Sequence, residues 1–250
     1  MDAKFFTAWI EETARVIAAN RDHLTRLDAA IGDADHGTNL DRGFAAVREA
    51  LAARPAGTPG DVLTLTGTTL IRKVGGASGP LYGTAFRQMG TALNAAAQPA
   101  PPPADAPPPG NAGAVPPAGD AGTTTAPGAE GVTAPAGGGE VTLSELAAAF
   151  EAALAGVRRL GGAAEGDKTM VDALAPATRA LAVAANGGMK PEEALDAALA
   201  AAEEGAQATI PLQARKGRAS YLGERSIGHK DPGAASTALI FAALRAVAAG

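Results

Sequence analysis

The chain contains no cysteine among its 250 residues. This excludes a disulfide framework, a thiolate metal site and a cysteine nucleophile. Aromatic residues make up only 4% of the chain, whereas alanine is abundant and apolar residues reach 46%. This balance favours closely packed helices over a sheet built from β-branched and aromatic side chains.

Excess basic charge and long apolar runs are also missing. The formal net charge is −5, so no basic field favours nucleic acid as a partner. No apolar run approaches the roughly 20 residues that span a bilayer. The first residues, "MDAKFFTAWIEETARVI", contain acids and lack the basic and apolar regions of a signal peptide. We therefore expect a cytoplasmic protein that binds neither nucleic acid nor membrane.

One segment of low complexity interrupts the chain. Residues 98–139 hold 11 of the 18 prolines, no lysine or arginine, and two valines as their only large apolar side chains. Such a segment buries too little apolar surface to offset the entropy lost on ordering. We predict a disordered Pro/Gly/Ala-rich insertion within a single domain that spans residues 1–250.

The remaining sequence has the apolar spacing of helices. Apolar residues recur every three or four positions between Phe5 and Ile17. The same pattern predicts further helices over 142–160, 172–185, 191–209 and 234–249, several of them preceded by a capping residue or by proline. No convincing run of alternating strand residues is found. The sequence therefore predicts an all-α fold whose Gly-rich connections carry the unusual polar residues.

Three aspartates lie close together in and before the stretch "IGDADHGTNLDRGF", residues 31–44. Asp28, Asp33 and Asp35 allow three interpretations. They could cap backbone amides in a solvated loop, which is common for aspartate near glycine. A calcium loop of the EF-hand type is excluded, because Thr38 and Phe44 occupy the positions that require Gly and Glu. The third interpretation is a Mg²⁺ site, because a hard cation neutralises carboxylates held together.

Protein-bound Mg²⁺ is usually completed by substrate phosphates, so a Mg²⁺ site predicts phosphate-binding elements elsewhere. Three loops have suitable character, namely "VGGASGP" (74–80), "EGDKTM" (165–170) and "HKDPGAAS" (229–236). The stretch 213–229 adds several basic side chains. Neither a GxxxxGK[ST] motif nor a strand followed by GxGxxG is present, which excludes a P-loop and a Rossmann site. Together these features indicate a Mg-nucleotide site.

These motifs, in this order, resemble the nucleotide-binding L subunit of dihydroxyacetone kinase. The resemblance covers nearly the whole chain outside the Pro/Gly/Ala-rich segment. It implies an antiparallel bundle, or barrel, of about eight amphipathic helices with Mg-ADP or Mg-ATP bound in the loops at one end. It also implies two Mg²⁺ ions held by Asp28, Asp33 and Asp35. The nucleotide contacts that it implies are His36, Thr38, Asn39, Ala77, Ser78, Gly161, Met170, Arg218, Asp231 and Gly233.

Several of these roles are open to a second interpretation. Met170 either contacts the adenine or belongs to the ordinary core, and basic residues close to Arg218 could serve in its place. The amide of Thr38 is expected to matter more than its side chain, and Ser78 either contacts phosphate or serves only its own turn. His36 is expected to donate to phosphate and not to act as a base, while the other two histidines are expected to be structural.

The resemblance also implies partners. In this family a separate K subunit holds dihydroxyacetone, so we expect no catalytic residue on this chain beyond the metal-nucleotide site. In the phosphoenolpyruvate-dependent version, ADP remains bound as a coenzyme and a phosphohistidine M subunit rephosphorylates it. The lack of a fused K-like domain favours this version. An ATP-dependent kinase subunit for dihydroxyacetone or another short keto-sugar is also compatible with the motifs, as is a nucleotide-dependent protein that acts through a transcriptional regulator. A homodimer is also expected.

Overall fold

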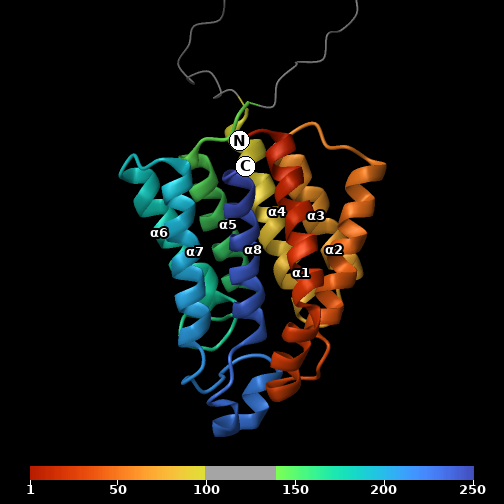
Figure 1. Cartoon of the computed structure of the whole chain (residues 1–250), viewed down its shortest axis with the longest axis vertical. Helices are drawn as coiled ribbons and strands as arrows, with labels where there is room; N and C mark the ends of the chain where they lie inside the picture. The colour runs from red at the N-terminus through yellow and green to blue at the C-terminus, as the bar shows by residue number, and fades with distance from the viewer. Residues whose placement is uncertain (99–138) are drawn as a thin grey trace, which may run out of the picture.

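The computed structural model of the chain describes residues 1–98 and 139–250 (Figure 1). These residues form α-helices and one short 3₁₀ segment, η1, and they contain no strand. The predicted all-α fold is therefore confirmed. The elements are α1 (Ala3–Ile31), α2 (His36–Ala53), α3 (Pro59–Lys73), α4 (Ser78–Ala96), α5 (Leu143–Gly161), α6 (Val171–Asn186), α7 (Pro191–Ala208), η1 (Arg218–Ser226) and α8 (Pro232–Ala248).

The helix boundaries follow the local signals in the sequence. At α5, the Thr142 side chain accepts from the Glu145 amide and the Glu145 carboxylate accepts from the Thr142 amide, which forms a capping box. Helices α7 and α8 begin at Pro191 and Pro232, where a missing amide hydrogen costs nothing. None of the described helices is both long and apolar enough to cross a membrane. The insertion predicted over 98–139 falls almost entirely outside the described residues.

The helices close into a ring. Each helix packs against the next one in the chain, and α8 returns to pack against α1. At this closure the buried indole of Trp9 donates from Nε1 to the Ile240 carbonyl at 3.0 Å. Phe86 and Phe150 flank the same indole, with ring centroids 5.7 and 6.1 Å away. The core is thus formed by the inward faces of helices that run along the long axis of the molecule (Figure 1).

This up-and-down order sorts the connections between two ends. The loops α1–α2, α3–α4, α5–α6 and α7–α8 lie at one end, at the bottom of Figure 1. Both chain termini lie at the opposite end, where Met1 and Val141 exchange two backbone hydrogen bonds of 3.0 and 2.8 Å. All four polar motifs found in the sequence therefore meet at the end that is remote from the termini.

Helices α3 and α4 pack unusually closely through glycines spaced seven residues apart. These are Gly60 and Gly67 on α3 and Gly83 and Gly90 on α4. A Cβ atom added at Gly67 would lie 2.4 Å from the Gly83 carbonyl oxygen, and one at Gly90 would lie 2.5 Å from that of Gly60. The obstacle in both cases is backbone, which cannot swing away. This contact fixes the two helices that flank the 74–77 turn.

We predict that Gly67→Ala destabilises the fold by about 1–3 kcal/mol, because the two helices must separate to admit the methyl group. Gly57→Ala is the control, since a Cβ atom there would meet no atom within 4 Å and Gly57 does not have a positive φ. This control should be unchanged or more stable by up to about 1 kcal/mol, because alanine reduces the conformational freedom of the unfolded chain. Urea unfolding measures both values. Equal stability of the two variants would contradict the close-packing argument.

Candidate functional site

The four loops at the end opposite the termini surround a cavity of about 290 Å³. The first residues of the even-numbered helices all line it, namely His36, Ser78, Val171 and Pro232. Of the odd-numbered helices that end nearby, α1 and α5 contribute their last residues to the lining. Helix N-termini carry partial positive charge and amide donors without intrahelical partners. Their convergence makes the cavity suited to an anion such as phosphate.

The three predicted aspartates lie together at one side of this cavity. One carboxylate oxygen from each of Asp28, Asp33 and Asp35 lies within 4.8 Å of the others. Asp28, on the last turn of α1, is buried, and its Oδ2 accepts from the amides of Asp35 (2.8 Å) and His36 (3.1 Å). A Cβ atom on Gly32 would lie only 2.0 Å from Asp28 Oδ1, so the loop can pass there only with glycine.

Capping alone does not account for this cluster. Asp35 is the N-cap residue of α2, yet within the described residues its side chain makes no capping hydrogen bond. Ala34, between Asp33 and Asp35, has a φ of +61°, a conformation that residues other than glycine rarely adopt. A loop that concentrates negative charge in this way fits a hard cation with oxygen ligands. The residues present therefore suit Mg²⁺.

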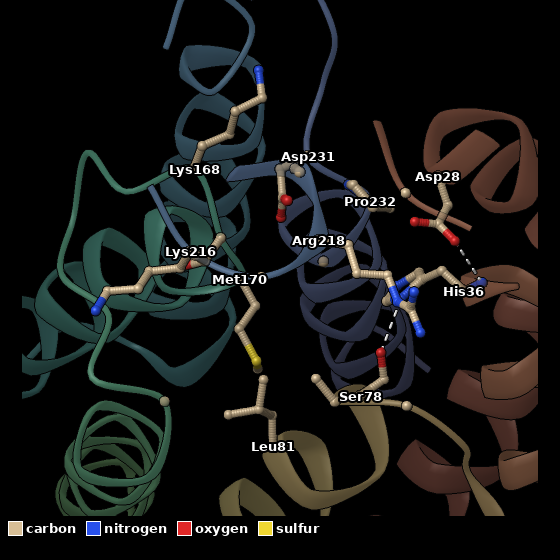
Figure 2. A pocket seen from close by; sticks show the side chains of 18 of the residues that line it. Asp28, His36, Ser78, Leu81, Lys168, Met170, Lys216, Arg218, Asp231 and Pro232 are labelled. Carbon is tan, nitrogen blue, oxygen red and sulfur yellow. Dashed lines mark hydrogen bonds between the residues drawn. The ribbon is translucent and has the colours of Figure 1, made fainter. Parts of the chain in front are cut away.

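Arg218 reaches across the cavity mouth to this cluster. Its Nε lies 2.9 Å from Asp33 Oδ2, and both side chains are exposed. An exposed ion pair of this kind contributes little free energy, so another ligand can displace it. Lys216 also lines the cavity, but Figure 2 shows its amine pointing away from the aspartate side. Arg218 is thus the member of the basic stretch that faces the carboxylates.

His36 is buried behind the aspartates and held at both ring nitrogens. Nδ1 lies 3.1 Å from Ser78 Oγ and Nε2 lies 2.8 Å from Ser236 Oγ. Burial lowers the pKa of His36 despite the opposing effects of Asp28 and Asp35, which favours the neutral ring at pH 7. Its predicted contact with phosphate remains a prediction, because both nitrogens already have partners.

A buried tyrosine anchors this network. The Tyr82 hydroxyl lies 2.7 Å from Ser236 Oγ and donates to the Gly233 carbonyl at 2.8 Å. Burial raises the pKa of Tyr82 to about 12, so the phenol stays protonated at physiological pH. Tyr82 therefore fixes the start of α8 relative to α4.

The other side of the cavity is apolar. Leu81, Val157, Met170 and Val171 line it together with Gly161. Figure 2 shows the Met170 side chain directed towards Leu81. A cavity with anion-attracting groups at one side and this apolar wall at the other suits a molecule with a phosphate end and a flat, weakly polar end.

Asp231 lies between these sides as the N-cap of α8. Its carboxylate accepts from the Ala234 amide at 2.7 Å. Burial is the main cause that raises the pKa of Asp231 to about 7; the Ala234 amide and Lys168 oppose this shift, and the charges of Asp172 and Asp28 add to it.

All predicted site residues except Thr38 and Asn39 line the cavity. Thr38 is exposed, and Asn39 Oδ1 accepts instead from Arg42 Nη2 at 2.7 Å. The structure also brings in lining residues that were not predicted, among them Leu81, Tyr82 and Lys168. Lys168 lies inside the predicted 165–170 loop and Tyr82 lies two residues after the 74–80 stretch, but no spacing rule distinguished their side chains from the neighbours.

The fold and cavity define a class of protein, namely an all-helical ring that places helix N-termini and a carboxylate cluster around one anion site. Comparison with known proteins identifies the family. The DAK2 domain matches residues 30–106 and 129–246. The chain belongs to the DAK2 domain family.

Relatives in bacteria share most of the chain. The ADP-binding subunit DhaL of the PEP-dependent dihydroxyacetone kinase of Escherichia coli K12 is 39% identical over 228 residues, which are 91% of this chain and 89% of that protein. The D-erythrulose kinase of Mycolicibacterium smegmatis is 32% identical over 95% of this chain, which spans 34% of that longer protein.

The fold recurs in a solved structure. The dihydroxyacetone kinase of C. freundii, crystallised with AMP-PNP and Mg²⁺, superposes with a TM-score of 0.61 at 24% identity. The match covers 96% of this chain and 33% of the kinase chain. At this level of identity the likeness supports the all-helical fold.

We predict that Asp33→Asn and Asp35→Asn each weaken Mg²⁺-dependent ADP binding at least tenfold, or about 1.4 kcal/mol. The amide keeps the shape of the carboxylate but removes the charge that attracts the cation. Asp41→Asn is the control, because Asp41 lies on α2 outside the cavity lining. Titration calorimetry with Mg²⁺ or with EDTA measures the affinity. Unchanged affinity in both cluster variants would refute the metal assignment.

We also predict that Asp231→Asn alters the pH dependence of stability. The folded pKa of about 7 exceeds the usual value of 3.8, so the stability contributed by the buried acid is full below about pH 4 and is lost as the pH rises through about 7. Asparagine still caps the helix but does not ionise. Its gain in melting temperature over the parent should grow between pH 5 and 8, by about 2–4 °C for each 1 kcal/mol. A gain that is constant with pH would contradict this assignment.

Proposed function

We propose that this chain is the ADP-binding subunit of a phosphoenolpyruvate-dependent dihydroxyacetone kinase. It holds Mg-bound nucleotide in the cavity and passes a phosphoryl group to dihydroxyacetone on a separate K subunit. The observation that carries this proposal is the meeting of four helix N-termini with the Asp28–Asp33–Asp35 cluster at one cavity. The similarity to the ADP-binding subunit DhaL of Escherichia coli supports the choice of reaction.

The cavity residues have distinct roles in phosphoryl transfer. The aspartate cluster would hold two Mg²⁺ ions, which supply charge neutralisation for the phosphates. Ser78, at the start of α4, offers a hydroxyl and nearby amides to a phosphate oxygen. His36 orients that hydroxyl through Nδ1, and the exposed Arg218 is free to exchange Asp33 for a phosphate.

The apolar wall receives the base of the nucleotide. With the phosphates at the aspartates, the rest of the nucleotide extends towards Leu81, Met170 and Gly161. Burying the apolar ring faces contributes roughly 25 cal/mol per Å² of area removed from water. Base and phosphates are thus recognised by opposite sides of the cavity.

Among the described residues, the groups that line the cavity leave the acceptor hydroxyl without a base. The aspartate cluster is assigned to metal, His36 is buried between two serines, and the Tyr82 phenol remains protonated. The Asp231 carboxylate is engaged at the start of α8. The residues that bind and activate dihydroxyacetone therefore belong to the K subunit.

A partner can dock beside the cavity mouth. Tyr221 on η1 is 88% exposed, and Ile227 directly after η1 is also exposed. Exposed aromatic side chains beside a ligand site are common anchors of protein interfaces. We assign the K subunit to this end and propose that a phosphohistidine M subunit uses the same opening to rephosphorylate ADP.

We place the protein in the cytoplasm as a homodimer. A kinase subunit acting on another short keto-sugar is the second candidate, which the similarity to D-erythrulose kinase favours. Two alternatives to the coenzyme mechanism are ATP-dependent phosphoryl transfer and a nucleotide-dependent role with a transcriptional regulator.

We predict that the isolated chain with Mg²⁺, ATP and dihydroxyacetone forms no dihydroxyacetone phosphate, because the acceptor must be held in line with the phosphate. Adding a K subunit should allow transfer. Repeated turnover from bound ADP should further require a phosphorylated M subunit. A coupled assay with glycerol-3-phosphate dehydrogenase measures the product. Multiple turnovers by the chain alone would refute the division of labour.

The nucleotide that remains with the purified chain distinguishes phosphoenolpyruvate from ATP as the source of the phosphoryl group. ADP that survives gel filtration supports the coenzyme mechanism. A site that exchanges ATP and ADP within the time of the column instead supports ATP-dependent transfer.

A further inference from the structure

The connection between α7 and α8 is long and has little regular structure, yet it carries much of the cavity. It runs from Thr209 to Asp231 and contains η1. Arg218 and Asp231 both belong to it, and Gly233 lies two residues after Asp231, in the first turn of α8. A segment of this kind needs fixed points if its side chains are to meet a ligand in one geometry.

The ammonium group of Lys168 provides such a point. Lys168 lies in the α5–α6 loop and is 1% exposed. Its Nζ donates to the carbonyl oxygens of Thr209 at 2.8 Å and Leu212 at 3.1 Å, and also to the carbonyl of His229. One ammonium therefore joins the beginning of the connection to its end.

The surroundings of the ammonium resemble a site for a free monovalent cation. Among the described residues, the hydrogen-bond partners of Nζ are backbone carbonyl oxygens and include no carboxylate. Burial lowers the pKa of the Lys168 amine, and the negative charges of Asp231 and Asp172 nearby oppose this shift. Figure 2 shows the amine directed away from Ser78 and the Asp28 side of the cavity, so it is not aimed at a phosphate.

The backbone at this position supports a special role. Lys168 has a φ of +61°, which residues other than glycine rarely adopt. The loop around it is held by Asp172, which accepts from the amides of Gly166 at 2.6 Å and Thr169 at 2.7 Å. The Arg215 amide also donates to the Asp167 carbonyl at 3.0 Å. The two loops are thus locked together, with the ammonium at the centre of the contact.

We propose that Lys168 is a positioning residue that acts as a built-in monovalent cation for the α7–α8 connection. When its side chain is removed, the carbonyl cage accepts a free monovalent cation instead. The cage sets the shape of the segment that carries Arg218 and Asp231. The part of this inference that concerns nucleotide affinity rests on the proposed function, whereas the part that concerns loop structure does not.

The first experiment compares Lys168→Met and Lys168→Gly with Lys190→Met and Lys190→Gly. Lys190 is exposed, and it precedes α7 at the opposite end of the molecule. Hydrogen exchange of residues 209–231 is measured without nucleotide, and Mg-ADP affinity is measured separately. We expect at least tenfold faster exchange and at least tenfold weaker binding in the Lys168 variants only.

Cation rescue provides the discriminating result. Ammonium, methylammonium or K⁺ should restore slow exchange in Lys168→Gly, whereas tetramethylammonium at equal ionic strength should not fit the cage. Mg-ADP affinity should recover in parallel. Unchanged exchange in both Lys168 variants, or faster exchange that none of the small cations reverses, would overturn the proposal.

A further variant tests the proposal in case Lys168→Met and Lys168→Gly fold poorly. Because the chain has no cysteine, Lys168→Cys introduces a unique thiol that can be alkylated in the unfolded chain. Bromoethylamine yields a side chain with the length and charge of lysine, and bromopropane yields a neutral one of equal length. After refolding, only the aminoethylated protein should show slow exchange of residues 209–231. Equal exchange rates in the two products would overturn the proposal. Slow exchange in the aminoethylated protein without Mg-ADP binding would support the loop role and refute the proposed function.

Discussion

Closure of the helical ring is the constraint on which the site depends. Among the described residues, eight helices in up-and-down order place every odd-to-even connection at one end. The packing of α8 against α1 then brings the first and the last of these connections together. The Trp9–Ile240 hydrogen bond and the aromatic side chains around Trp9 secure this closure in the buried core. Loops far apart in the sequence are thereby forced to meet around one cavity. The position of the site thus follows from the order and packing of the helices and not from the side chains that line it.

The cavity combines charges that oppose one another. The N-termini of α2, α4, α6 and α8 favour an anion, whereas the aspartate cluster repels one unless a cation is present. Asp28 spans the two, since its carboxylate accepts amides at the start of α2 and also belongs to the cluster. A metal-bound phosphate satisfies both kinds of group at once. Neither free phosphate nor free metal does so alone.

Local patterns in the sequence allowed the fold class and the loops of the site to be predicted. The spacing of apolar residues predicts the helices, and stretches that contain Gly, Asp and Ser before a helix predict the loops. The individual site residues came from the family resemblance, which supplied 11 of the 25 residues that line the cavity. Thr38 and Asn39 were carried over with their motif, yet they lie outside the described lining because they are further along α2. Lys168 and Tyr82 could not be singled out, since their partners are more than 40 residues away in the chain. Such partners become neighbours only when the ring closes.

The placement of the chain ends has a consequence for how the domain can be joined to others. Residues 1 and 250, and the residues that flank the 99–138 segment, emerge at the end remote from the cavity. A polypeptide attached at any of these points starts its path away from the loops that line the cavity and from Tyr221. The same helical unit can therefore work as a free subunit or as one part of a longer chain, with its ligand entrance facing outward in both cases. For protein engineering, a reporter fused at this end leaves the cavity end of the molecule available to a partner.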